Sequence, residues 1–227
     1  MSNLSKTQID KLGDRLRKGG ITEADLKILD SYRKSYGRAY EKVIRIIQEK
    51  LHLEPTGRPA KSTSSIVDKL NRESIRLSQI QDIAGCRIVA ESIQEQNKIV
   101  SQVKTSFSSV VLIDRRLKPS YGYRAVHLII KVDEKLIEIQ VRTILQHEWA
   151  ELSERFSDKI DPAIKYGGGA STIQESLLKL SKHYADYEEL EADIFGSSHE
   201  TKEAETKWRD KMNKLKNELI RLAKLIG

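Results

Sequence analysis

The chain has 227 residues, of which 38% are hydrophobic and 32% charged, and a formal net charge of +7. This balance is typical of a globular protein rich in amphipathic helix, and the positive charge favours a polyanionic partner, either nucleotides or nucleic acid. The single cysteine, Cys86, excludes an internal disulfide and favours a reducing, cytoplasmic location. No apolar run approaches the roughly 20 residues of a membrane span, so no membrane association is expected.

Helical patterns dominate the first part of the chain. Apolar and aromatic residues recur at helical spacing over residues 22–51, where Thr22 and Asp25 resemble a capping pair. Residues 58–61 are predicted to form a loop. A helix should follow directly, with residues 62–65 (three serines and a threonine) near its start.

Strands and helices alternate through the middle of the chain. Small and β-branched residues in 83–92 predict a buried strand. The further elements expected are a helix at 92–107, strands at 110–114, 125–132 and 136–142, and a helix that Thr143 caps and that ends near residue 157. This order predicts an α/β (α+β) fold, a mixed β-sheet flanked by helices.

Both ends of the chain are expected to be helical. We predict an N-terminal helical extension at 1–52, a core at 53–165 and a C-terminal helical extension at 166–227. Apolar stripes in the last segment pack on the core, on a second copy in a homo-oligomer, or on a neutralising partner, and the sequence leaves these alternatives open. The stripes consist of Leu177, Leu180, Tyr184, Tyr187 and Leu190, and then Trp208, Met212, Leu215, Leu219, Leu222 and Ile226.

The strands at 125–132 and 136–142 are predicted to form a hairpin around a turn near residues 133–134. Their alternation places aliphatic side chains on one face, and a one-residue slip in register would destroy that segregation. Because unpaired polar groups are costly to bury, a polar face on a central sheet indicates a site. The polar face gathers His127, Glu138, Gln140 and Arg142.

Two carboxylates are the candidates for chemistry. Asp82 comes just before a buried strand, and Glu138 lies within another. If they converge at one edge of the sheet they suit Mg²⁺, which prefers oxygen ligands and keeps waters and substrate phosphates. The alternative is structural: Asp82 caps a turn, and Glu138 pairs with Arg142 or a lysine.

Basic residues cluster in sequence around these carboxylates. Arg58 and Lys61 precede a helix whose first hydroxyl and backbone N–H groups could bind phosphate. Neither a GxxxxGK[ST] loop nor a GxGxxG fingerprint is present, which excludes the Walker-type and dinucleotide sites. The other members of the cluster are Lys69, Arg72, Arg87, Arg115, Arg116, Lys118 and Arg124.

Tyr123 follows Gly122 in a predicted exposed turn. A ring there can stack on a purine, with Arg124 on a phosphate. The alternative is that Tyr123 packs down on the hairpin. Trp149, in the helix after the hairpin, is expected to lie in the helix core.

Taken in order, these motifs resemble a known family. R-x-x-K (58–61), S-I-x-x-K (65–69), "DIAGCRIV", "GYRAVH", "EIQVRT" and "HEWAEL" are similar to the RelA/SpoT nucleotidyltransferase domain over roughly residues 40–165. No hydrolase segment precedes them and no regulatory domain follows, so the chain resembles the single-domain small alarmone synthetases.

The resemblance implies a nucleotidyltransferase-like sheet, Mg²⁺ as cofactor, and pyrophosphate transfer from ATP to the 3′-hydroxyl of GDP or GTP, which makes (p)ppGpp and releases AMP. It implies that Arg58 and Arg87 bracket the adenine and that Lys61, Ser65 and Lys69 hold the ATP phosphates. Asp82 would bind Mg²⁺, and Glu138 would bind it too or take the proton of the attacking hydroxyl. Tyr123 would stack on the acceptor base, with His127, Gln140 and Arg142 lining the acceptor side.

Two departures from the family pattern bear on the substrates. The first loop, residues 58–61, is one residue longer than the usual R-x-K. Lys118, Pro119, Ser120 and Tyr121 replace a sequence with an asparagine in the loop that reads the acceptor. A toxic, antitoxin-controlled subgroup with a tyrosine pair about the glycine resembles this pattern, and some of its members pyrophosphorylate the 3′ end of tRNA or an adenosine nucleotide. A non-catalytic nucleotide- or RNA-binding module is the third interpretation.

Overall fold

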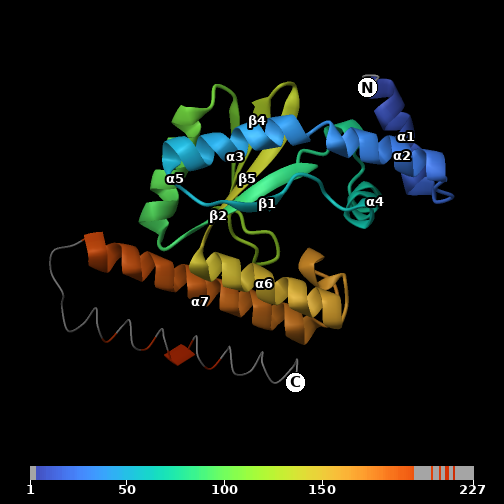
Figure 1. The fold of residues 1–227 in the computed structure, drawn as a ribbon. Coiled ribbons are helices and arrows are strands. Elements are labelled where there is room, and N and C mark those ends of the chain that lie inside the picture. Colours follow the sequence, from blue (N-terminus) through green and yellow to red (C-terminus); the bar gives the residue numbers. More distant parts are fainter. Residues whose placement is uncertain (1–3, 197–205, 207–209, 211–212, 215–216, 218–227) are drawn as a thin grey trace. The chain divides into compact units, whose positions relative to one another are not determined.

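The computed structural model describes residues 4–196, 206, 210, 213–214 and 217. Its helices and strands follow one another along the chain as coloured in Figure 1. In order they are α1 Lys6–Lys18, α2 Glu23–Lys34, α3 Gly37–Leu51, β1 Thr56–Arg58, α4 Thr63–Arg72, η1 Leu77–Gln79, β2 Ala84–Ala90, α5 Ile93–Ser106, β3 Val110–Asp114, β4 Val126–Val132, β5 Lys135–Thr143, α6 Ile144–Lys159, η2 Ile164–Tyr166 and α7 Ser171–Gly196.

The strands form one five-stranded sheet in the order β1-β2-β5-β4-β3. The fold is therefore α+β, a mixed sheet with flanking helices, as predicted. By internal contacts the chain divides into two units that interleave along the sequence. Unit 1 comprises residues 1–88, 102–112 and 128–140, and unit 2 comprises residues 89–101, 113–127 and 141–227. The three-segment division expected above remains a prediction.

The N-terminal helices of unit 1 begin at capping residues that the sequence predicts. The side chain of Thr22 accepts a hydrogen bond from the Asp25 backbone N–H, and the Asp25 carboxylate accepts one from the Thr22 backbone N–H, a complete capping box. The single helix expected over 22–51 is wrong, because α2 ends at Lys34 and α3 begins at Gly37. The Ser35 hydroxyl donates to the Tyr32 carbonyl (2.6 Å), and this side-chain bond competes with the helix.

Strand β1 was not expected from the sequence, which predicts a loop from residue 58. Its three residues pair antiparallel with β2, Thr56 opposite Arg87 and Arg58 opposite Gly85. A three-residue strand next to a proline has little propensity of its own. Pairing with β2 stabilises it, so a local pattern could not have predicted it.

The β4–β5 hairpin confirms the predicted turn and alternation. Asp133 and Glu134 both have positive φ angles (47° and 61°), as a two-residue type I′ turn requires. On one face Leu128 and Ile139 are fully buried, whereas Glu138, on the other, is half-buried. His127 and Gln140 are half-buried as well, whereas Arg142, predicted on the same polar face, is buried.

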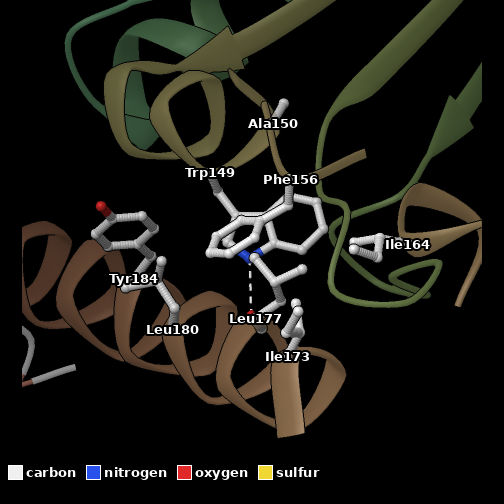
Figure 2. Packing of buried hydrophobic residues seen from close by; sticks show 8 residues of the cluster. All are labelled: Trp149, Ala150, Phe156, Ile164, Ile173, Leu177, Leu180 and Tyr184. Carbon is white, nitrogen blue, oxygen red and sulfur yellow. Dashed lines mark hydrogen bonds between the residues drawn. The ribbon is translucent and has the colours of Figure 1, made fainter. Parts of the chain in front are cut away.

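In unit 2, α6 and α7 run side by side (Figure 1) and enclose an apolar cluster (Figure 2). Trp149 is 5% exposed and its indole N–H donates to the Leu177 carbonyl (2.8 Å), which confirms it as helix core. The predicted stripe Leu177, Leu180 and Tyr184 is buried here as well. The second stripe, which starts at Trp208, lies outside the described residues.

Cys86 lies on β2 and is 4% exposed. Burial, with a smaller effect of the Glu138 charge, raises the pKa of its thiol to about 12. Within the described part of the chain, none of the helices has the length and apolarity that crossing a bilayer requires.

Candidate active site

Two lysines hold the Asp82 carboxylate in unit 1. Lys61 Nζ lies 2.5 Å from Asp82 Oδ2, and Lys69 Nζ lies 3.0 Å from Oδ1. The Lys61 backbone N–H donates to the Ile83 carbonyl (2.6 Å), which ties the loop before α4 to the start of β2. Lys69 reaches the same carboxylate from the body of α4.

The electrostatics of this group follow from its burial and its partners. Burial alone would raise the pKa of Asp82, but the charges and hydrogen bonds of Lys61 and Lys69 outweigh it and hold the pKa below its usual value. Asp82 is therefore ionised at neutral pH, and each of its oxygens already has a cationic partner. Any ligand that engages the lysines must compete with this carboxylate.

The start of α4 presents hydroxyl groups beside Lys61. Ser62 is the N-cap and accepts from the Ser65 backbone N–H (3.2 Å), and its hydroxyl donates to Ser65 Oγ (2.8 Å). The helix start predicted from 62–65 is thus confirmed. Arg33, which sequence reasoning missed, donates from Nη1 to the Lys61 carbonyl (3.3 Å) and to Thr63 Oγ1 (3.2 Å).

Glu138 lies on β5 against Gly85 of β2. A Cβ added to Gly85 would lie 2.7 Å from the Glu138 carbonyl oxygen and 3.3 Å from its Cβ. Gln140 donates from Nε2 to Glu138 Oε2 (2.7 Å). The structure thus brings Gln140, expected on the acceptor side, to the candidate base. The convergence of Asp82 and Glu138 on one ion remains a prediction.

Replacing Gly85 with alanine tests how closely β2 and β5 approach. The added methyl group would overlap the Glu138 backbone, so we expect Gly85→Ala to lower the free energy of unfolding by about 1–3 kcal/mol. Denaturant titration measures the change. The matched control is Gly37→Ala at the start of α3, where an added Cβ meets nothing within 4 Å. Equal stability of the two variants would contradict the close approach.

The donor set is compatible with Mg²⁺ but is not a complete metal cage. Among the described residues, no group of three or more His, Cys, Asp or Glu side chains is placed to hold a metal. Mg²⁺ commonly needs only one or two carboxylates, with substrate phosphates and waters as its other ligands. Asp82 and Glu138 supply such carboxylates. The arginines expected at the adenine lie on paired strands, Arg58 ending β1 and Arg87 within β2.

A second cluster, in unit 2, joins three of the predicted acceptor residues. The Tyr123 hydroxyl lies 2.9 Å from His127 Nε2 and accepts a hydrogen bond from Arg142 Nη2 (3.0 Å). The Arg142 guanidinium also lies over the Tyr123 ring, 5.1 Å from its centroid. Tyr123 is half-buried and packs against Trp149 and against His127 of β4, as in the alternative in which its ring packs down on the hairpin.

The exposed ring of this turn belongs to Tyr121, which is 56% exposed. Ser120 and Tyr123 exchange backbone hydrogen bonds (2.9 and 3.2 Å) around Tyr121 and Gly122, which both have positive φ angles (53° and 89°). A Cβ on Gly122 would lie 2.7 Å from the Trp149 ring, so glycine is required there for space as well as conformation. Lys118, earlier in the loop, is exposed.

Helix α7 holds the same turn through residues that sequence reasoning missed. The Ser181 hydroxyl donates to the Gly122 carbonyl (2.6 Å). Arg124, predicted to bind the acceptor, forms an ion pair with Glu188 (2.7 Å), and both side chains are largely buried (11% and 2% exposed). The sequence held one signal of this ion pair, because Glu188 aligns with the apolar stripe of α7.

The part of the chain that contains the candidate site is similar to known proteins. Residues 57–159 match the family described as "Region found in RelA / SpoT proteins". An uncharacterized protein of Mycobacterium tuberculosis (strain H37Rv) is 38% identical over 111 residues, which cover 47% of this chain and 41% of that protein. The GTP pyrophosphokinase YjbM of Bacillus subtilis is 33% identical over 129 residues, 48% of this chain and 60% of that protein. The chain thus spans less than two thirds of the length of these relatives.

Solved structures share the fold. The small alarmone synthetase 2 of Bacillus subtilis superposes with a TM-score of 0.58 at 26% identity, over 76% of this chain and 98% of that one. A GTP pyrophosphokinase family protein of Streptococcus pneumoniae gives 0.55 at 25% identity, over 77% and 94%. Residues 57–159 of this chain thus match the RelA/SpoT region, and the fold is that of small alarmone synthetases.

Proposed function

We propose that this chain is a pyrophosphokinase that transfers the β,γ-pyrophosphate of ATP to the 3′-hydroxyl of GDP or GTP. The observation that carries the proposal is the Asp82 carboxylate held by Lys61 and Lys69 within the RelA/SpoT region. Matched relatives named GTP pyrophosphokinase, from Bacillus subtilis and Escherichia coli, support the same activity. The reaction belongs in the cytoplasm, where both nucleotides are available.

Unit 1 supplies the donor side. Lys61, Lys69 and the Ser65 hydroxyl bind the ATP phosphates, and Arg58 and Arg87 bind the adenine. Asp82 and Glu138 hold Mg²⁺, which when bound neutralises charge on the phosphates. Since Lys61 and Lys69 contact Asp82, ATP binding exchanges the partners of these lysines, which then contact the phosphates.

The acceptor oxygen attacks the β-phosphorus of ATP. A bond forms between the 3′-oxygen and that phosphorus, and the bond from the phosphorus to the oxygen shared with the α-phosphate breaks. AMP leaves with the electron pair. Glu138 accepts the 3′-hydroxyl proton, and the basic side chains stabilise the charge spread over the transferred group.

Unit 2 supplies the acceptor side. Tyr123 and Tyr121 offer rings to the base. His127 and Arg142, which hold the Tyr123 hydroxyl, fix one of these rings. The exposed Tyr121 and the net charge of +7 favour the 3′ end of tRNA as a second candidate acceptor. Self-association and a neutralising partner remain predictions.

One assay tests the function. The protein is incubated with Mg²⁺ and ATP labelled on its terminal phosphate, and separately with GDP, GTP, ATP or deacylated tRNA. We expect label on GDP or GTP together with release of AMP. Label on tRNA alone would show that the acceptor is tRNA and not GDP or GTP. Nucleotide binding without transfer to any acceptor would indicate a non-catalytic module and would overturn the proposal.

Substitution of Tyr123 tests the acceptor side. Since stacking on an aromatic ring contributes about 1–3 kcal/mol per base, we expect Tyr123→Ala to raise the acceptor KM about tenfold or more and to leave the ATP KM unchanged. Tyr123→Phe is the matched control, because it keeps the ring and removes only the hydroxyl that His127 and Arg142 contact. Steady-state titration of each substrate measures both KM values. An unchanged acceptor KM in Tyr123→Ala would show that the Tyr123 ring does not contact the acceptor.

A further inference from the structure

Glu188 is a buried carboxylate on α7, outside the family region at residues 57–159. It is 2% exposed, and its two oxygens have partners from two other parts of unit 2. Oε2 accepts from Arg124 Nη1 (2.7 Å), and Oε1 accepts from the Thr143 hydroxyl. Gln146 Nε2 lies 3.1 and 3.3 Å from the two oxygens. Both oxygens of this buried carboxylate therefore have hydrogen-bond partners.

The partners of Glu188 lie at the end of the 120–123 turn and at the start of α6. Arg124 directly follows Tyr123, and Thr143 is the N-cap of α6, with its side chain accepting from the Gln146 backbone N–H (3.2 Å). Glu188 therefore joins the end of the 120–123 turn to the start of the helix that carries Trp149. Trp149 in turn packs against Tyr123.

The same helix holds the turn at a second point. Ser181 lies seven residues before Glu188, which is two helical turns, so both side chains leave α7 on one face. The Ser181 hydroxyl donates to the Gly122 carbonyl (2.6 Å) and is buried. The turn is thus held on both sides of Tyr123, at the residue before it and at the residue after it.

We infer that Glu188 is a positioning residue for acceptor binding: through its buried ion pair with Arg124, and together with Ser181, it holds the Tyr123 turn in its binding conformation. Arg124 then acts through Tyr123 rather than on a substrate phosphate. This inference rests on the proposed function. It assigns to α7 a part in acceptor recognition, because a ring held on both sides loses less conformational freedom when a base stacks on it.

The test compares Glu188→Gln with Glu189→Gln, which removes the same charge from the next, exposed position of α7. We expect Glu188→Gln to raise the acceptor KM at least fivefold, with the ATP KM within twofold of the parent. Hydrogen exchange should accelerate at least tenfold at the Tyr123 amide, which donates to the Ser120 carbonyl in the parent (2.9 Å). Glu189→Gln should match the parent in all three measurements.

Ser181→Ala provides a second variant, since it removes one hydroxyl and keeps the helix even if Glu188→Gln fails to fold. It should raise the acceptor KM and the exchange rate of the turn in the same direction. Parental exchange rates and acceptor KM in both variants would overturn the positioning role. Hydrogen exchange decides this independently of catalysis, whereas absence of transfer by the parent would count against the proposed function instead.

Discussion

Glu138→Gln is expected to lower pyrophosphate transfer by about 10²- to 10⁴-fold, the usual contribution of a general base. The substitution removes the carboxylate that is proposed to take the proton of the attacking hydroxyl. It keeps an oxygen that can accept from Gln140, whose Nε2 lies 2.7 Å from Glu138 Oε2, so β5 should keep its structure. Single-turnover measurement of label transfer from ATP to GDP gives the rate of the chemical step.

The control for this loss is Glu134→Gln, in the exposed turn of the same hairpin. It should transfer at the parental rate. Isothermal titration should show that Glu138→Gln binds ATP about as tightly as the parent, because a loss confined to chemistry leaves ground-state binding intact. Transfer by Glu138→Gln at the parental rate would show that another group accepts the proton.

Asp82→Asn should separate two functions of this carboxylate: the neutralisation of Lys61 and Lys69, and the proposed binding of Mg²⁺. Asp82 neutralises Lys61 and Lys69, whose Nζ atoms lie 2.5 and 3.0 Å from its carboxylate oxygens. Without that negative charge the lysines are more available to phosphate, so we expect metal-free ATP to bind about tenfold more tightly, which corresponds to about 1.4 kcal/mol. Transfer should nevertheless fall at least about 100-fold, because a ligand of Mg²⁺ is lost.

Titrations of ATP in EDTA and in Mg²⁺ measure both effects, with Asp68→Asn on the exposed face of α4 as the matched control. The two lysines lose a partly buried counter-ion, so the free energy of unfolding should also fall by about 1–3 kcal/mol, and titrations should be made well below the unfolding temperature. Weaker or unchanged binding of metal-free ATP would contradict the exchange of partners.

Local patterns predicted the elements that local interactions stabilise. The capping box at Thr22, the serine N-cap of α4 and the Asp133–Glu134 turn each depend on residues within four positions, so the sequence shows all of the participants. Strand β1 depends on pairing with β2, about thirty residues further along the chain. The break between α2 and α3 falls at Ser35 and Tyr36, where the Ser35 hydroxyl donates to the Tyr32 carbonyl, and helical periodicity does not reveal it.

In the candidate site, too, the sequence predicted local features but not contacts between distant residues. Periodicity placed Glu138 and His127 on a polar face and the motifs named Asp82, but neither predicted that Lys61 and Lys69 would hold this carboxylate. Those contacts span 21 and 13 residues. The partner of Arg124 is 64 residues away on α7, and no sequence spacing specifies such a contact.

The burial of Cys86 has a practical consequence for spectroscopy. Thiolate is the form that reacts with maleimides, and the only thiol in the 227-residue chain is enclosed in β2 with a pKa of about 12. The unmodified protein should therefore resist alkylation under native conditions. A cysteine introduced at Tyr121 would accept a single dye without first removing Cys86, so fluorescence could follow the binding of the acceptor at the turn.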